Sequence, residues 1–228
     1  MIEDRSGQSR TGQDSTGRDL AGSIGARPKR AGTIFVVDDD ERVLRSLQRL
    51  LKISGYAVTP FADAGSLLGS AELPTAECIV LDLGLPDRDG LSVQEALAAM
   101  DGHPSIVFLT GSADVPASVR AMKAGAVDFL MKPVEEAALL SAIEAGVRRT
   151  RGEREAEHQK ALVLARLESL TAREAEVMQH VVAGRLNKQI AGDLGTVEKT
   201  IKVHRARMMA KLGVRTVADL VRLVEHAR

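Results

Sequence analysis

The sequence has little of what disulfide-rich, membrane and secreted proteins need. It contains one cysteine, Cys78, and no tryptophan, and only 2% of its 228 residues are aromatic. A single cysteine excludes an intrachain disulfide and fits a reducing compartment. No apolar run approaches the roughly 18 residues of a membrane-spanning helix, and residues 1–30 lack the apolar segment of a signal peptide. We therefore expect a cytoplasmic protein with no membrane partner.

Basic residues are few in the first part of the chain and acidic residues are few in the last part, although the net charge of the whole chain is zero. Residues 31–146 carry 8 Lys and Arg against 17 Asp and Glu, a net charge of −9, whereas residues 169–228 carry 11 against 6, a net of +5. The asymmetry predicts two domains with different partners, the basic one facing a polyanion. Residues 1–30 mix Gly, Ser, Arg and Asp, contain too few apolar residues to fold, and are predicted to be a disordered tail.

Short apolar runs alternate with helical patterns in the acidic part of the chain. Five such runs occur, at residues 33–37, 56–59, 77–81, 105–109 and 127–130. The middle runs are almost continuously apolar, which is typical of strands buried on both faces. The first helical pattern, from Val43 to Leu51, ends at Gly55. This alternation predicts an α/β fold with a doubly wound, five-stranded parallel sheet.

Polar residues follow four of the predicted strands. They are Asp38, Asp39 and Asp40 after the first strand, Asp82 after the third, Thr110 after the fourth, and Lys132 with Pro133 after the fifth. The carboxyl ends of parallel strands meet at one edge of a sheet, so these side chains should converge. Carboxylates there suit Mg²⁺, and a hydroxyl and an ammonium can hold a phosphoryl group beside it. The simpler alternative is that the three aspartates form a polar turn and the start of a helix.

The motifs VVDDD, LDLGLPDRDG and FLTGSADVPASVRAMKAGAVDFLMKP resemble the receiver domain of bacterial two-component response regulators. The resemblance covers residues 33–146, and we assign residues 31–146 to this predicted domain. The resemblance implies a CheY-like fold, Asp82 as the phosphoacceptor and a sensor histidine kinase as partner. The other roles it implies are Mg²⁺ binding by Asp38, Asp39, Asp82 and the carbonyl of Gly84, phosphoryl binding by Thr110 and Lys132, an aromatic switch at Phe129, and a cis Lys132–Pro133 bond. Asp40 is expected at a helix N-terminus instead. The loop GSADVP departs from the pattern of close relatives at Ser112 and Ala113.

Two other functions compete with this interpretation. A phosphohydrolase of the haloacid-dehalogenase type also forms an aspartyl-phosphate, but it carries a second acid two residues after the nucleophile, where this chain has Gly84. An adaptor with a degenerate receiver domain would not need Asp39, Asp82, Thr110 and Lys132 together. Because the second acid of such a hydrolase is absent at Gly84, we do not expect an enzyme.

The basic part of the chain predicts four short helices. Residues 147–166 form a charged helical linker, and residues 167–228 a helical domain. Thr171 and Glu174 form a capping box at the first helix, which ends near Gly184, and Thr216 with Asp219 caps the last. The middle two helices, joined near Gly195, have the spacing of a helix-turn-helix. On the third helix Ile201, Met208 and Leu212 are predicted to face the core.

This part resembles the LuxR/NarL-type DNA-binding domain, through LTAREAEVMQHVVAG, NKQIA and TIKVHRARMMAKLG. The resemblance implies that Lys202, Val203 and Ala206 face base edges and that Lys188, Thr200, His204, Arg205 and Arg207 contact phosphates. A merely solvated basic helix is the alternative. The whole chain resembles the FixJ-like subgroup, which implies a transcriptional activator that binds promoter DNA and RNA polymerase and forms a homodimer when phosphorylated. The opposite charges of the two domains further suggest that they dock before phosphorylation.

Overall fold

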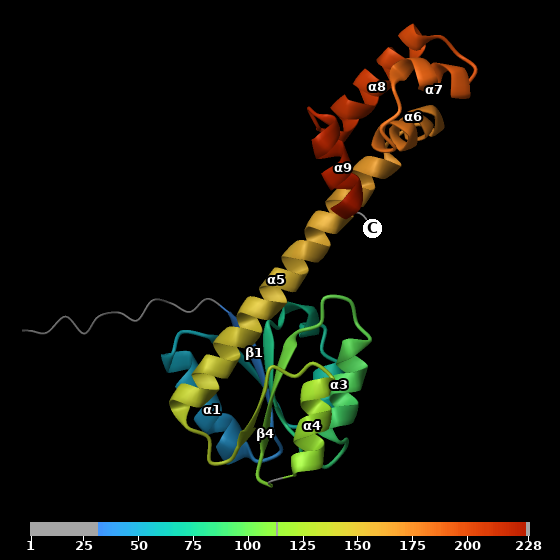
Figure 1. Ribbon diagram of the computed structural model, residues 1–228. Helices are drawn as coiled ribbons and strands as arrows, with labels where there is room; N and C mark the ends of the chain where they lie inside the picture. The colour runs from blue at the N-terminus through green and yellow to red at the C-terminus, as the bar shows by residue number, and fades with distance from the viewer. Residues whose placement is uncertain (1–31, 113, 227–228) are drawn as a thin grey trace, which may run out of the picture.

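The computed structural model describes residues 32–112 and 114–226, so the predicted tail and Ala113 lie outside the described residues. The strands are β1 (Thr33–Val37), β2 (Ala57–Phe61), β3 (Cys78–Asp82), β4 (Ser105–Thr110) and β5 (Asp128–Met131). They form one parallel sheet in the order β2-β1-β3-β4-β5, as Figure 1 shows. The predicted fold class is confirmed. β2 runs on through Pro60, which an edge strand tolerates because one side of it pairs with no neighbour.

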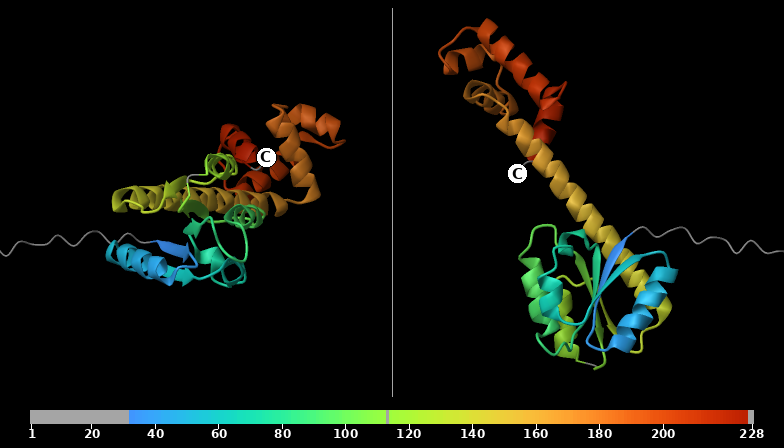
Figure 2. Two further views of the ribbon diagram at one scale, coloured as in Figure 1. Left: turned by 90° about the horizontal axis from the view of Figure 1, so that it is seen from below. Right: turned by 180° about the vertical axis from the view of Figure 1, so that it is seen from behind.

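Helices cover both faces of the sheet (Figure 2). One face packs on α1 (Glu41–Ile53) and the first half of α5 (Glu136–Glu168), and the other on α2 (Ala64–Leu68), α3 (Gly90–Ala98) and α4 (Val115–Lys123). A short 3₁₀ turn, η1 (Leu73–Thr75), precedes β3. The central strands β3 and β4 are buried along their whole length, as their continuous apolar runs predict.

Asp40 begins α1, as expected. Its carboxylate accepts a hydrogen bond from the Arg42 backbone N–H at 2.7 Å, and this bond lowers the pKa of Asp40. The helix then buries Leu44, Leu47 and Leu51 against the sheet. The third aspartate of the sequence is therefore a helix cap, while the first one points into the site described below.

The helix α5 is continuous over 33 residues, from the α/β domain into the helical domain. It is still bound to the sheet well beyond Gly146. Thr150 is fully buried, and its hydroxyl accepts a hydrogen bond from Ser105 N at 2.9 Å. Arg154 donates to the carbonyl oxygens of Ala76 (2.7 Å) and Gly102 (3.1 Å). The predicted start of the linker at residue 147 therefore falls within a segment that packs on the sheet.

The helical domain contains α6 (Ala172–Val182), α7 (Asn187–Asp193), α8 (Glu198–Leu212) and α9 (Val217–His226). Ile201, Met208 and Leu212 are fully buried, which confirms the predicted inner face of α8. Gly184 and Gly213 follow α6 and α8 with φ of 74° and 69°, a left-handed backbone that favours glycine. In Figure 1 this domain stands at the far end of α5 and α8 does not lie against the sheet. The expected docking of the two domains is thus wrong for this conformation.

The capping box at α6 is present and is tied to α8. Thr171 N donates to Glu174 Oε2 at 2.9 Å, and Lys211 Nζ of α8 lies 2.6 Å from the same oxygen. The Lys211 ammonium and then the Thr171 backbone N–H lower the pKa of Glu174 to about 2, from an ordinary value of 4.5. Since the carboxylate is 4% exposed, the charged form is held inside the domain by these partners.

We expect this carboxylate to make the helical domain sensitive to acid. Because the folded pKa is depressed, the stabilisation is complete above pH 4.5 and is lost as the pH falls toward 2. Glu174→Gln should therefore lower the free energy of unfolding at pH 7, with the difference from wild type vanishing near pH 2 to 3. Urea unfolding of the intact protein, followed by amide NMR signals of α6 to α9, measures this.

The matched control is Glu176→Gln, two residues away on α6, which removes an exposed ion pair with Arg173. That variant should follow the wild-type pH dependence. If wild type and Glu174→Gln lose stability in parallel on acidification, the pair does not act as described.

Candidate functional site

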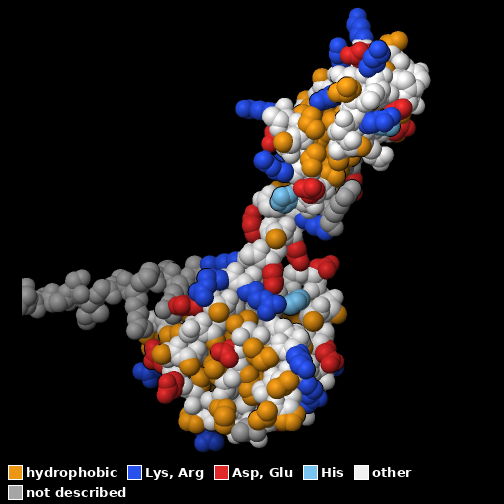
Figure 3. Space-filling model, viewed as in Figure 1, with side chains coloured by type: hydrophobic (Ala, Val, Ile, Leu, Met, Phe, Trp, Pro, Cys, Tyr) orange, Lys and Arg blue, Asp and Glu red, His pale blue; other side chains and the backbone are white. Residues whose placement is uncertain are grey.

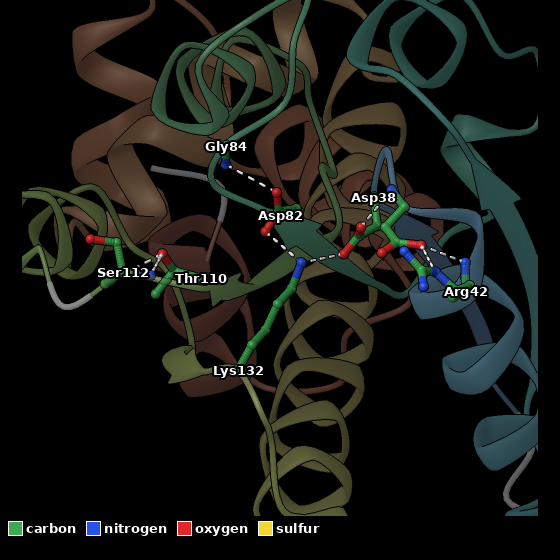
Figure 4. Close-up of polar contacts among 8 residues, drawn as sticks. Asp38, Arg42, Asp82, Gly84, Thr110, Ser112 and Lys132 are labelled. Atoms are coloured by element: carbon green, nitrogen blue, oxygen red, sulfur yellow. Dashed lines mark hydrogen bonds and ion pairs between the residues drawn. The ribbon is translucent and has the colours of Figure 1, made fainter.

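The ammonium group of Lys132 lies between two carboxylates at the carboxyl edge of the sheet. Its Nζ is 2.5 Å from Asp38 Oδ2 and 2.8 Å from Asp82 Oδ1. Lys132 follows β5, Asp82 ends β3 and Asp38 follows β1. Figure 4 shows the three side chains pointing toward one another. Two nearby carboxylates repel unless a cation lies between them. Lys132 therefore allows Asp38 and Asp82 to lie close together in their charged forms.

Burial and the neighbouring carboxylates have opposite effects on the pKa of the Lys132 ammonium group. Partial burial lowers the pKa of its ammonium group, but the hydrogen bonds and charges of Asp38 and Asp82 outweigh burial and raise that pKa above its ordinary value. Asp38 is 1% exposed and Asp82 is 8% exposed. Lys132 therefore stays charged, and the Asp82 carboxylate is held in place at the rim of the sheet.

The loop after β3 also contacts Asp82. Gly84 N donates to Asp82 Oδ2 at 3.2 Å, so each oxygen of this carboxylate has its own partner. The Lys132–Pro133 peptide bond is cis, as the resemblance implies.

Three other predicted residues lie apart from this cluster. Asp39 is exposed. The Thr110 hydroxyl donates to Ser112 O at 3.1 Å and accepts from Ser112 N at 3.2 Å, and Figure 4 shows it away from Lys132. Phe129 is half-buried, and its ring centroid lies 6.1 Å from that of Phe108. The structure brings together Asp38, Asp82, Gly84 and Lys132, and leaves Asp39, Thr110 and Phe129 around them.

The chemistry of the cluster suits a hard divalent cation. The buried carboxylates of Asp38 and Asp82 supply oxygen ligands, which is the ligand type that Mg²⁺ prefers. Within residues 32–112 and 114–226, however, no three acidic, His or Cys side chains are arranged closely enough to form a ready metal cage. The residues fit Mg²⁺ by donor type, with Asp38 and Asp82 as the two buried carboxylates.

Asp87 holds the loop after Asp82 in place, and sequence reasoning missed it. Its carboxylate accepts from Ala64 N at 3.2 Å and from Gly65 N at 3.0 Å, at the start of α2. Desolvation raises the pKa of Asp87, but these backbone N–H groups together outweigh it and lower the pKa overall. An exposed acid in a turn-like LPDRDG motif gives no sequence signal for a partner 22 residues away.

A cavity of about 610 Å³ opens beside Lys132. It lies between α1 and the segment that joins β5 to α5, and its lining residues are Arg42, Val43, Ser46, Leu47, Leu109, Lys132, Pro133 and Val134. The lining is mostly apolar with two basic side chains. A partner that reaches Asp82 can rest its own apolar side chains here.

A second surface lies on α4 and β5. Val115, Val119, Met122 and Met131 are between 45% and 67% exposed, although all four are large and apolar. Figure 3 shows hydrophobic side chains gathered on the lower part of the α/β domain, where α4 begins in the same view of Figure 1. We call these four residues the α4–β5 patch. Exposed apolar surface of this kind is typical of an interaction site.

The predicted DNA-facing residues of the helical domain lie mostly on the outer side of α8. Lys202, Val203, Ala206 and Arg207 are exposed, and Lys188 is exposed on α7. Thr200, His204 and Arg205 are half-buried. The guanidinium of Arg205 donates to Asn187 Oδ1 at 3.0 Å, so it also joins α8 to α7. Lys202 pairs with Glu198 one turn before it, at 3.0 Å.

Comparison with known proteins assigns both parts of the chain. Residues 34–144 match the response regulator receiver domain, and residues 168–224 match the bacterial regulatory proteins of the luxR family. Nodulation protein W of Bradyrhizobium diazoefficiens is 43% identical over 84% of this chain and 85% of its own length. Transcriptional regulatory protein FixJ of Azorhizobium caulinodans is 38% identical over 83% and 90%.

Solved structures agree with these relatives. The response regulator StyR is 47% identical and superimposes with a TM-score of 0.78, over 85% of this chain and 98% of its own. Full-length FixJ from B. japonicum is 39% identical and superimposes with a TM-score of 0.51, over 86% and 97%. Among the described residues, no helix has both the length and the apolarity needed to cross a membrane.

Proposed function

The chain belongs to the transcriptional response regulators that join a receiver domain to a LuxR-type DNA-binding domain, and from this premise we propose that phosphorylation of Asp82 by a sensor histidine kinase switches its binding to promoter DNA. A receiver domain implies a histidine kinase partner, and the LuxR-type domain implies DNA. The family consists of regulators, not enzymes. The observation that most supports Asp82 is its place beside the Lys132 ammonium at 2.8 Å.

In the proposed reaction the Asp82 carboxylate attacks the phosphorus of the kinase phosphohistidine, and the histidine nitrogen leaves. Lys132, released from Asp38, pairs with a phosphoryl oxygen and keeps the new charge compensated. Receiver domains generally bind Mg²⁺ for this step, and we assign it to Asp38, Asp39, Asp82 and the Gly84 carbonyl. When bound, Mg²⁺ neutralises negative charge on the phosphoryl group. The kinase is proposed to use the cavity beside Lys132.

The response to phosphate is assigned to Thr110 and Phe129. The Thr110 hydroxyl now bonds to Ser112, and we propose that it turns toward the phosphoryl group once Asp82 is modified. Phe129 then moves into the vacated space and changes the neighbouring α4–β5 patch. A phosphoryl group shifts this equilibrium only by its preference for one state, so the two states lie within a few kcal/mol of each other.

Phosphorylation is proposed to produce a homodimer through the α4–β5 patch. We expect Val119→Asp to keep the phosphorylated protein monomeric, because an unpaired charge would be buried between the subunits. The control is Ile53→Asp, since Ile53 is also a large exposed aliphatic residue but lies on α1. Sedimentation velocity with acetyl phosphate and Mg²⁺ measures this. A phosphorylated Val119→Asp dimer would exclude the patch as the interface.

For the DNA-binding domain, Lys202→Ala is expected to reduce discrimination between sequences by about 1–3 kcal/mol per contacted base pair, because base contacts carry specificity. Arg207→Ala should weaken binding to all duplexes alike, because phosphate contacts carry no sequence information. Fluorescence anisotropy with a selected and a scrambled duplex compares the two. If both variants lose specific and non-specific affinity in the same ratio, the assigned orientation of α8 is wrong.

As a promoter-bound activator, the protein is further proposed to act in the cytoplasm and to contact RNA polymerase. The test of the whole proposal is recovery and sequencing of genomic DNA bound by the full-length protein, with and without acetyl phosphate and Mg²⁺. We expect discrete sites that are enriched by phosphorylation. Equal recovery of all sequences in both conditions would contradict a phosphorylation-switched regulator.

A further inference from the structure

The two helices of the helix-turn-helix begin differently from most other helices of this chain. Asp40, Asp63, Asp89, Asp114 and Thr171 each accept a backbone hydrogen bond at the start of α1, α2, α3, α4 and α6. In contrast, α7 and α8 begin at Leu186 and Val197, whose aliphatic side chains accept no hydrogen bond; at α7 the side chain of Gln189 instead accepts one from Leu186 N at 2.9 Å. α5 also lacks a side-chain capping bond, but it begins at a polar residue, Glu135. We call Leu186 and Val197 the aliphatic caps.

The aliphatic caps are among the most exposed large apolar residues in the described part of the chain. Leu186 is 68% exposed and Val197 is 65% exposed. A leucine or valine at this position both omits the capping bond and leaves apolar surface in water, where serine would avoid both costs. Two such choices in one motif depart from the rule that α1, α2, α3, α4 and α6 follow. Violations of this kind concentrate at functional sites.

The surroundings of the caps identify the occupant. Lys188 follows Leu186 by two residues and is exposed, and Asn187 binds Arg205 of α8 at 3.0 Å. Val197 precedes Lys199 and Lys202, both exposed, on the helix that also shows Val203 at 42% exposure. Each cap is thus continuous with the basic surface of α7 and α8, on a domain with a net charge of +5. The partner that fits this surface is a polyanion that also presents apolar atoms to Leu186 and Val197.

We propose that Leu186 and Val197 are part of the DNA-binding surface and contact apolar atoms of duplex DNA, either deoxyribose carbons or thymine methyl groups. The inference rests on the proposed function and extends it from the basic side chains to two aliphatic ones. The helices give up a stabilising cap in exchange for apolar contact with the duplex. Stability and affinity should therefore respond in opposite directions to the same substitution.

The test uses full-length phosphorylated protein and duplexes selected by wild type from a randomised library. Leu186→Ser and Val197→Ser each add a capping hydroxyl and remove the aliphatic contact. We expect each variant to unfold at the same or a higher temperature than wild type and yet to bind the selected duplex about fivefold more weakly, as loss of part of one buried aliphatic side chain predicts. Leu186→Met and Val197→Ile, which retain an aliphatic surface, should restore most of the affinity.

Ile53→Ser is the matched control, because Ile53 is 67% exposed but lies on α1 of the receiver domain. Its DNA affinity should equal that of wild type. The source of the apolar atoms is identified by replacing thymine with uracil in the selected duplex, which removes the methyl groups and leaves every deoxyribose. If the contact is with thymine methyl groups, wild type should lose affinity for the uracil duplex, whereas the serine variant should not. If the contact is with deoxyribose, wild type should still bind the uracil duplex more tightly than the serine variant does.

Serine variants that bind the selected duplex as tightly as wild type, or more tightly, would overturn the inference and leave the proposed function standing. Failure of wild type itself to select any duplex would overturn both. A serine variant that unfolds at a lower temperature would contradict the statement that these positions are capped poorly.

Discussion

Replacing Asp82 with Asn is expected to abolish phosphorylation by acetyl phosphate while leaving the fold intact. The amide has almost the shape of the carboxylate but cannot act as the nucleophile, so at least a hundredfold loss of label should follow, as loss of a covalent acceptor implies. Lys132 retains Asp38 at 2.5 Å, so the site keeps one ion pair and should not collapse. Phosphate-affinity electrophoresis measures the label, and circular dichroism checks the fold.

Two further variants test whether the loss of label is specific to Asp82. Asp39→Ala should slow phosphorylation and weaken its dependence on Mg²⁺, because Asp39 is an assigned ligand and not the acceptor. Asp101→Asn, an exposed acid in the loop before β4, should behave as wild type. Label on Asp82→Asn at the wild-type level would remove Asp82 from its role, and an unchanged Mg²⁺ dependence of Asp39→Ala would return the second aspartate to a simple turn.

The second large effect concerns where the receiver domain ends. We expect a fragment of residues 1–157 to fold and a fragment of residues 1–146 to be less stable by roughly 3–5 kcal/mol. The shorter one loses the burial of Val147, which is 6% exposed, and leaves Ser105 N without the Thr150 hydroxyl. An unsatisfied buried N–H costs about 1–3 kcal/mol, and burying a valine contributes a similar amount. Against a typical stability of about 5–15 kcal/mol, this loss is large.

Urea unfolding of both fragments, followed by circular dichroism, measures the difference. Thr150→Val in the longer fragment isolates the hydrogen bond from the helix itself and should cost about 1–3 kcal/mol. Equal stability of the two fragments would mean that α5 beyond Gly146 contributes nothing, and that the domain boundary lies at residue 146, as the charge pattern suggests.

Periodicity and strand order carried most of the fold and the centre of the site. Continuous apolar runs predicted β3 and β4, and the rule that strand ends meet at one edge predicted the convergence of Asp38, Asp82 and Lys132. The inward positions Ile201, Met208 and Leu212 followed from helical spacing. In each case a repeated pattern or a fixed topology determines where the residue lies.

The missed features depend on contacts between distant segments. Arg151 and Arg154 look like solvated linker charges, yet Arg151 binds Glu77 and Arg154 binds backbone carbonyls near β3 and β4. No local pattern separates an arginine that reaches a carbonyl from one in water. Arg205 was assigned to phosphate by its position in a motif, and its bond to Asn187 depends on how α7 crosses α8. Sequence spacing does not encode that crossing.

The continuity of α5 gives the protein a lever. Val147 faces the sheet and Leu167 packs on the helical core, and at 3.6 residues per turn these positions differ by roughly 200° around the axis, so the two domains occupy opposite sides of one rod. Because α5 is bound to the sheet as far as Arg154, its free part is residues 155–168, about 21 Å long at 1.5 Å per residue. A tilt of about 10° where it leaves the sheet therefore moves the tip by roughly 4 Å. Successive base pairs are about 3.4 Å apart. In a dimer, the angle at which two rods leave the receiver pair would therefore set the distance between the two recognition helices, and with it the half-site spacing that the dimer accepts.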